Sequence, residues 1–187
     1  MFIRHSEMTA REEKAIVAFW LIPAEPARTH FGSLIAELAS RFDAPVFEPH
    51  LTLFAIAKEK DFIVPKPDVL ALFSAPRLFV REVKCSDAFT KTVFIQFAGH
   101  QRLLEMNSAL RRTCERPSNY NLDPHLSLIY KTMSSMQQER LAASIKIPFQ
   151  EVRFDSVKTV LCPTPIEKRE DVEAWRVIDV QRLKDHA

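Results

Sequence analysis

The sequence is unusually poor in glycine: Gly32 and Gly99 are the only two among 187 residues. Loops that bind phosphate through backbone amides, as in Walker and dinucleotide-binding motifs, need clustered glycines so that the chain can approach the phosphate closely. Two isolated glycines can build neither motif. If the protein binds phosphate, we therefore expect it to do so with side chains.

Cysteine is also scarce, and the apolar runs are short. Cys85, Cys114 and Cys162 are odd in number and form no C-x-x-C pair, which argues against a disulfide framework and against a structural zinc site. The apolar run over 15–22 is far too short to cross a bilayer and lacks the cleavage signature of a signal peptide. We therefore expect a cytoplasmic protein that does not engage a membrane.

An excess of charge of one sign is nearly absent as well. The 26 Lys and Arg residues and 24 Asp and Glu residues leave a formal net charge of +2. So small an excess does not suggest a dedicated binder of duplex DNA, and we expect no DNA partner. The length suits one domain with a substantial core, so we treat 1–187 as a single domain and expect a monomer. The charged run over 167–171 is expected to be a surface loop.

Hydrophobic patterning predicts the same succession of elements twice. Strands are predicted over 15–22, 45–54, 77–85, 92–98, 124–130, 152–161 and 173–180. Helices are predicted over 25–42, 67–74, 100–114 and 134–145. Each half reads strand, helix, strand with a P-H-L-[ST]-L motif, helix, strand, over about 15–86 and 91–180. Trp20 and Phe97, in matching strands, precede their motifs at similar spacing. The repeat implies an α+β fold of two similar lobes with antiparallel sheets, related by a pseudo-two-fold axis.

The repeated motif places a histidine and a hydroxyl on one face of a strand. Residues i and i+2 of a strand share a face, so His50 and Thr52 point one way while the leucines beside them point the other. The same holds for His125 and Ser127. Two such strands side by side would place two imidazoles and two hydroxyls on one surface.

These groups suit the hydrolysis of a phosphodiester. A histidine titrates near neutral pH, so one neutral imidazole can act as base while a second, protonated one acts as acid. The hydroxyls can donate hydrogen bonds to the non-bridging oxygens, where charge accumulates in the transition state. The arrangement requires no metal or other cofactor, and its spacing fits none of the usual zinc patterns. A single H-x-T is weak evidence, but two copies in matching places favour a catalytic pair.

The paired motifs resemble those of the 2H phosphoesterase superfamily. The fuller strings F-W-L-I-P at 19–23, F-x-P-H-L-T-L at 47–53 and P-H-L-S-L-I-Y at 124–130 are similar to its cyclic phosphodiesterase branch, and the resemblance covers about 15–180. It implies a bilobal α+β fold in which two antiparallel sheets line a central cleft, with helices on the outer faces. It also implies hydrolysis of ADP-ribose 1'',2''-cyclic phosphate, a by-product of tRNA splicing, or of nucleoside 2',3'-cyclic phosphates.

By motif match, the resemblance assigns a role to the histidine and to the hydroxyl residue of each motif. His50 and His125 would be the acid–base pair, and Thr52 and Ser127 the phosphate ligands. Which histidine is the acid and which the base stays open, because the roles in a pseudo-symmetric site depend on the side on which the leaving group lies.

Four further residues are candidates for binding the substrate. Trp20 falls on a cleft tryptophan of the branch, and Tyr130 on a tyrosine that helps to place the attacking water. By strand parity, however, Tyr130 lies on the face opposite His125 unless a bulge or the strand end turns it. Phe89 and Lys91 lie just before a strand, at the expected rim of the cleft. There Phe89 would stack on a nucleobase, and Lys91 would bind a phosphate.

Other functions stay open. The loop over 118–123 is expected to border the cleft but does not follow the pattern of the branch, so the substrate is less defined than the reaction. One alternative is a 2',3'-cyclic phosphodiesterase or 2'-5' RNA ligase-like enzyme that acts on an RNA 3' end. Another is a nucleotide-binding module of the same fold without catalysis. A cysteine hydrolase is disfavoured because no cysteine has a recognisable nucleophile context.

Overall fold

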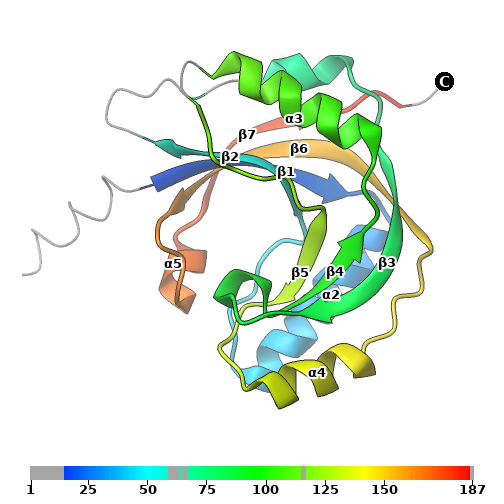
Figure 1. The fold of residues 1–187 in the computed structure, drawn as a ribbon, viewed down its shortest axis with the longest axis vertical. Helices are drawn as coiled ribbons and strands as arrows, with labels where there is room; N and C mark the ends of the chain where they lie inside the picture. Colours follow the sequence, from blue (N-terminus) through cyan, green and yellow to red (C-terminus); the bar gives the residue numbers. More distant parts are fainter. Residues whose placement is uncertain (1–14, 59–63, 65–66, 115–116, 186–187) are drawn as a thin grey trace, which may run out of the picture.

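The computed structural model describes residues 15–58, 64, 67–114 and 117–185. The elements of these residues follow in the order β1 (Ala15–Pro23), α2 (Ala27–Phe42), β2 (Leu51–Lys58), the 3-10 helix η1 (Pro67–Leu72), β3 (Arg77–Cys85), the 3-10 helix η2 (Phe89–Lys91), β4 (Val93–Phe97), α3 (Gln101–Thr113), β5 (His125–Ile129), α4 (Ser135–Ser144), β6 (Glu151–Pro163), α5 (Arg169–Glu173) and β7 (Arg176–Arg182) (Figure 1). The described residues contain no helix with the length and apolar character that a bilayer span requires.

An antiparallel sheet organises the fold. Its strands run in the order β2-β1-β6-β3-β4-β5, and β7 pairs with β6. The start of β6 pairs with β3, as at Val152 with Leu78, and the remainder pairs with β1 and β7. At 13 residues, β6 is long enough to serve both halves. The predicted α+β class is confirmed, and the two predicted sheets are joined through β6 into one. The duplication and its two-fold axis stay a prediction.

The sheet curls so that its two end strands meet. β2 and β5 lie at opposite ends of the pairing order, yet they contact each other across the opening of the curve (Figure 1). These are the strands that carry the two P-H-L-[ST]-L motifs. The curvature therefore brings together two segments that are far apart both in the chain and along the sheet.

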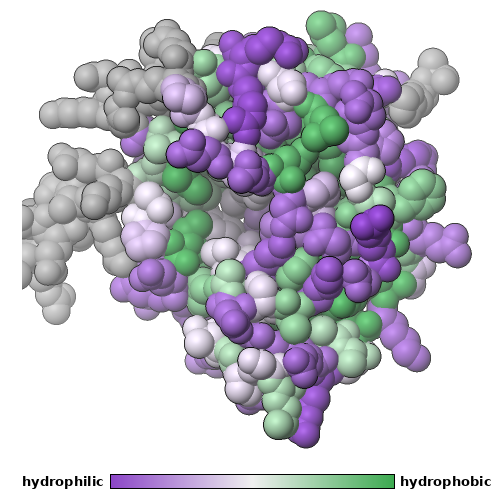
Figure 2. Space-filling view, in the orientation of Figure 1, coloured by the Kyte–Doolittle hydropathy of each residue, from purple (hydrophilic) through white to green (hydrophobic). Residues whose placement is uncertain are grey.

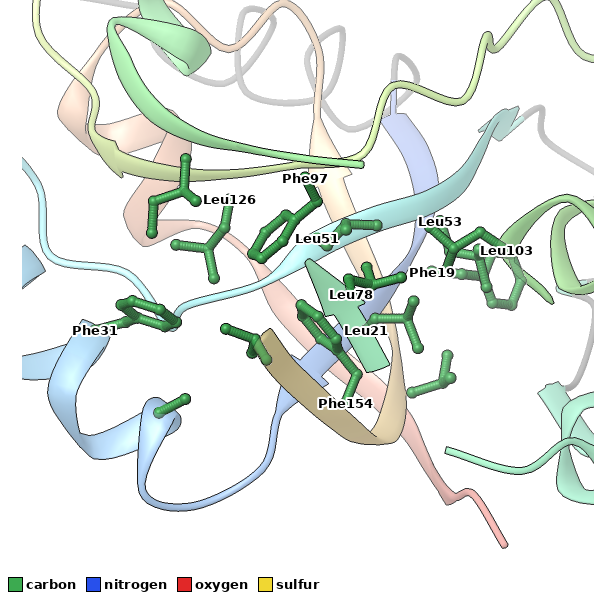
Figure 3. Packing of buried hydrophobic residues seen from close by; sticks show 14 of the residues in the cluster. Phe19, Leu21, Phe31, Leu51, Leu53, Leu78, Phe97, Leu103, Leu126 and Phe154 are labelled. Carbon is green, nitrogen blue, oxygen red and sulfur yellow. The ribbon is translucent and has the colours of Figure 1, made fainter. Parts of the chain in front are cut away.

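Helices cover the convex side of this curved sheet. Figure 1 shows α3 on one outer side and α2 and α4 on the opposite side. α3, from the second half of the chain, packs on β2, whereas α2, from the first half, packs on β5. The motif leucines Leu51, Leu53, Leu126 and Leu128 are fully buried in one apolar cluster beneath these helices. Figure 3 shows the first three of them. Because each helix packs on the motif strand of the other half, the two halves share one core.

Three predicted segments differ in the structure. The strand predicted over 173–180 begins only at Arg176, because Glu173 ends the helix α5. The strand predicted over 45–54 begins only at Leu51, because prolines at positions 45 and 49 lack the N–H group that a sheet ladder needs. The loop predicted over 167–171 instead leads into the short helix α5. Asp171 is buried and accepts hydrogen bonds from the backbone N–H groups of Glu167 and Lys168 at 3.0 and 3.2 Å, which satisfies the start of that helix.

Adjacent leucines on α3 provide a test of the packing. Leu103 is 0% exposed in the core, whereas Leu104 is 54% exposed. We expect Leu103→Ala to lower the free energy of unfolding by about 2–5 kcal/mol, because it leaves a cavity under β2. Leu104→Ala should change it by about 0.5 kcal/mol or less. Urea denaturation followed by circular dichroism measures both, and equal effects would contradict the assignment of the buried face.

Candidate active site

A cleft of about 250 Å³ lies inside the curve of the sheet. Figure 2 shows the surface hollowed near its centre, where Figure 1 places the opening between β1, β2 and β5. The cleft brings together these residues predicted from the sequence: His50, Thr52, His125, Ser127, Trp20 and Tyr130. Phe89 and Lys91 do not line it, although Thr90 between them does. Phe89 instead lies beside Tyr130, with ring centroids 6.1 Å apart.

A β-bulge in β5 explains why Tyr130 faces the cleft. In the register with β4, Ser127 pairs with Phe94 and Ile129 with Val93, so that Leu128 is the extra residue. A bulge changes the alternation of side chains along a strand. Leu128 and Ile129 are therefore both buried in the core, and Tyr130 returns to the face that carries His125. The parity objection to Tyr130 is thus removed.

β2 has the same bulge at the matching position. Phe54 pairs with Phe19 and Thr52 with Trp20, which leaves Leu53 as the extra residue. After this bulge Ala55 lines the cleft, at the position that Tyr130 occupies after the second motif. The registers also correct the match proposed for Trp20. Its counterpart is Phe94, which pairs with Ser127.

The prediction that Phe97 matches Trp20 is therefore wrong, because spacing along the sequence reflects the lengths of the helix and connections between two strands and does not show which of their residues pair. Phe97 lies in the core, with its ring centroid 5.6 Å from that of Phe154 (Figure 3).

Both histidines are held by the backbone in the same way. His50 Nδ1 lies 2.7 Å from the carbonyl oxygen of Glu48, and His125 Nδ1 lies 2.8 Å from that of Asp123. A carbonyl oxygen only accepts hydrogen bonds, so Nδ1 carries the proton in each ring. In a neutral imidazole, Nε2 is then the unprotonated nitrogen. Each ring is thus oriented with Nε2 available for proton transfer.

The surroundings of the two rings differ. His50 is 6% exposed and stacks on Trp20, with ring centroids 3.8 Å apart and planes at 14°. Burial lowers the pKa of His50 to about 4. The side chain of His125 is 21% exposed, and its ring makes a T-shaped contact with Phe94, with ring centroids 5.5 Å apart. Burial also lowers the pKa of His125 below its ordinary value of 6.5, and the nearby ammonium of Lys91 acts in the same direction.

An acidic residue stands two positions before each histidine. The Glu48 carboxylate is bound by Lys158, at 2.8 and 2.6 Å, and by Arg28, at 2.5 Å. Asp123 forms an ion pair with Lys91 and lies 3.7 Å from His125 Nδ1. The sequence prediction did not use these acids, although the repeated [ED]-P-H over 48–50 and 123–125 was a visible signal. Glu48 is thus bound by two cations, whereas Asp123 is bound by one and lies beside its imidazole.

Two aromatic residues of the cleft were not predicted. Tyr120 donates a hydrogen bond from its hydroxyl to the backbone carbonyl of Thr52 at 2.7 Å, and it belongs to the loop expected to border the cleft. Trp175 lies just before β7. Its ring makes T-shaped contacts with Trp20 and Tyr130, with ring centroids 5.0 and 5.8 Å away. No motif marks Trp175, because the connection from α5 brings it to the cleft.

The remaining polar groups suit acid–base chemistry around an anion. The Ser127 hydroxyl donates to the Thr90 carbonyl at 2.8 Å. Tyr130 is stacked on Phe47, with ring centroids 4.0 Å apart, and burial raises its pKa above the ordinary value of 10, so it remains a neutral donor. The described residues include no group of three or more His, Cys, Asp or Glu side chains placed to hold a metal ion.

The sequence and the fold are similar to those of known phosphoesterases. The family model of cyclic phosphodiesterase-like proteins matches residues 16–70. The apo form of Escherichia coli LigT is 14% identical, with a TM-score of 0.59 over 92% of this chain and 99% of that chain. TT0787 of Thermus thermophilus is 13% identical, with a TM-score of 0.59 over 92% and 100%. None of the curated proteins compared with this sequence matches it.

These similarities confirm the resemblance predicted from the paired motifs. The chain has the α+β fold of the 2H phosphoesterases, and its N-terminal part matches the cyclic phosphodiesterase-like family. A further solved structure, described as a phosphoesterase, is 13% identical, with a TM-score of 0.53 over 91% of this chain and 99% of that chain.

The stacking of His50 on Trp20 can be tested by titration. We expect the His50 imidazole to titrate at about 4 in nitrogen-15 NMR spectra, with its proton on Nδ1 in the neutral form. Trp20→Ala should move this pKa up toward the ordinary value of about 6.5, because it admits water to the ring. A His50 pKa at or above 6.5 in the unaltered protein would contradict the burial.

Proposed function

We propose that the protein is a metal-independent phosphodiesterase that opens the cyclic phosphate of a nucleoside 2',3'-cyclic phosphate or of ADP-ribose 1'',2''-cyclic phosphate. The observation that carries the proposal is the pair of imidazoles in one cleft, each held at Nδ1 by a backbone carbonyl and flanked by the hydroxyl of Thr52 or Ser127. Escherichia coli LigT has been crystallised with phosphate, ATP, 3'-AMP and NADP+, which supports a nucleotide ligand.

In the proposed reaction, His50 is the base and His125 the acid. Nε2 of neutral His50 takes a proton from a water molecule as its oxygen attacks the phosphorus. The bond between phosphorus and one bridging ribose oxygen breaks, and Nε2 of protonated His125 gives its proton to that oxygen. The Thr52 hydroxyl donates to a non-bridging oxygen as its charge grows, and the Ser127 hydroxyl does the same once its proton turns from the Thr90 carbonyl to the phosphate. The product is a phosphate monoester.

The asymmetry of the cleft supports this assignment of roles. His50 is buried against Trp20, which disfavours its protonated form. The neighbouring Glu48 carboxylate is already engaged by Lys158 and Arg28. His125 is more exposed and has the Asp123 carboxylate close to Nδ1, which favours its protonated form. Proton uptake is therefore easier at His125.

Asparagine substitutions test the two histidines while keeping their orientation contacts. The amide nitrogen of Asn can occupy the place of Nδ1 and donate to the same carbonyl, but Asn has no counterpart of Nε2. We expect His50→Asn and His125→Asn each to lower kcat for cyclic phosphate hydrolysis in EDTA by about 10²–10⁴-fold. The control is His30→Asn, since His30 lies against Phe149 outside the cleft.

The possible outcomes separate the functions. Loss in both cleft variants with an intact control supports the two-histidine reaction. Unchanged hydrolysis in either cleft variant would contradict it. Nucleotide binding without hydrolysis by the unaltered protein would establish the non-catalytic module instead.

The pH dependence of kcat/KM tests the acid. Activity needs neutral His50 and protonated His125, so it should be greatest between about 4 and the lowered pKa of His125 and fall above that. His125 faces the charged groups of Asp123 and Lys91 and the imidazole of His50. Asp123→Asn removes an anion that favours the imidazolium, so the basic limb should move to lower pH. Lys91→Met removes a cation, so this limb should move to higher pH. Shifts of the same sign in both variants would contradict the assignment.

A further inference from the structure

Side chains hold the backbone of β2 at the end of the sheet. β2 ends the pairing order of the described strands, with β1 as its neighbour. Three of its backbone carbonyls accept hydrogen bonds from side chains of the second half of the chain, those of Thr52, Leu53 and Ala55 from Tyr120 at 2.7 Å, Asn107 at 2.8 Å and Ser118 at 2.6 Å, respectively. Three side chains thus take the place of a neighbouring strand along the segment that follows His50.

One guanidinium, that of Arg111 on α3, joins these three side chains. Its Nε donates to the amide oxygen of Asn107 at 3.0 Å, its Nη1 to the carbonyl of Ser118 at 2.8 Å, and its Nη2 to the carbonyl of Tyr120. The guanidinium also lies over the ring of Phe54 in β2, 5.3 Å from its centroid. Because the guanidinium is planar, its donors form a rigid fork. Arg111 therefore fixes how α3 and the loop over 118–120 sit on β2 (Figure 1).

The contact from Tyr120 falls on Thr52, which lines the cleft beside His50. Burial raises the pKa of Tyr120 above its ordinary value of 10, so its hydroxyl keeps the proton that it donates. The contact engages the backbone carbonyl of Thr52 and not its hydroxyl. Leu53, the next residue, is the extra residue of the bulge, and the amide of Asn107 binds its carbonyl. Two successive peptide units are thus fixed from outside the cleft.

We propose that Arg111 is a positioning residue that, through Tyr120 and Asn107, holds the Thr52 hydroxyl where it meets the phosphate. The inference rests on the proposed function and adds a residue outside the catalytic cleft, since Arg111 and Asn107 are not among the residues that line it. A donor stabilises a transition state only if it is held in place beforehand. The bond from Thr52 strengthens as charge grows on the phosphate, so its misplacement lowers kcat more than it raises KM.

Three substitutions separate the geometry of the fork from its charge. Arg111→Met removes the fork, and we expect kcat for adenosine 2',3'-cyclic phosphate to fall about tenfold while KM changes less than about twofold. Arg111→Lys keeps the charge but has no fork, so kcat should fall by a similar factor. The control is Arg112→Met, because Arg112 is exposed and lines a separate depression with Phe73. It removes one charge from the same helix and should leave kcat unchanged.

A double-mutant cycle with Thr52→Ala tests whether Arg111 acts through Thr52. If it does, Arg111→Met should lower kcat by less than about twofold once the Thr52 hydroxyl is absent, because the group that it positions is gone. A purely structural contribution would lower kcat by the same factor in both backgrounds. Circular dichroism establishes that each variant is folded. Tyr120→Phe removes only the hydroxyl that binds the Thr52 carbonyl, and it replaces Arg111→Met in the cycle if that variant does not fold.

The outcomes separate the positioning role from the proposed function. A loss of kcat that Arg111→Met and Arg111→Lys share, and that disappears in the Thr52→Ala background, supports the role. If hydrolysis depends on His50 but Arg111→Lys keeps full kcat, or the effects of Arg111→Met and Thr52→Ala multiply, the role is overturned while the reaction stands. If no cyclic phosphate is hydrolysed in a His50-dependent way, the proposed function fails and the positioning role fails with it.

Discussion

The contact between β2 and β5 is the constraint on which the candidate site depends. These strands lie at opposite ends of the sheet's pairing order, and only the curl of the sheet brings their histidines to one cleft. The curl is maintained by packing on the convex side, where α2 packs on β5 and α3 packs on β2. Because the leucines of each motif alternate with its polar residues, burying Leu51 and Leu126 directs His50 and His125 to the opposite face. The apolar core and the polar cleft are two sides of the same strands.

The backbone of the cleft is nearly symmetric, but its side chains are not. Each motif strand has a bulge at the third residue after the histidine, and each histidine is held by the carbonyl two residues before it. Trp20 stacks on His50, whereas the matching Phe94 lies at a steep angle to His125, with the ring planes at 73°. Ala55 occupies, after the bulge of β2, the position that Tyr130 occupies after the bulge of β5. A symmetric site would give both imidazoles similar acidity, so these differences allow one ring to be neutral while the other carries a proton.

Period-two patterning was sufficient to predict the polar face of the motif strands. It placed His50 with Thr52 and His125 with Ser127, and both pairs line the cleft. It was insufficient for Tyr130, because the bulge at Leu128 depends on pairing with β4 rather than on the local sequence. Trp175 was missed for a similar reason: a short helix after β6 carries it to the cleft. Lys91 was expected to face phosphate, but its ammonium pairs with Asp123, a residue that the sequence reasoning had not used.

The most direct test of the two-histidine account replaces the leaving oxygen with sulfur. A thiolate leaves without a proton, so a nucleoside 2',3'-cyclic phosphate with sulfur at the leaving bridging position does not need the general acid. Each of the two bridging positions is substituted in turn. The account predicts that, at one of the two positions, sulfur reduces the loss of kcat caused by His125→Asn by at least about tenfold relative to the oxygen ester. The loss of kcat caused by His50→Asn should be unchanged. The account would be contradicted if sulfur left the loss of kcat equal in both variants on every ester, or if it restored kcat in His50→Asn instead of His125→Asn.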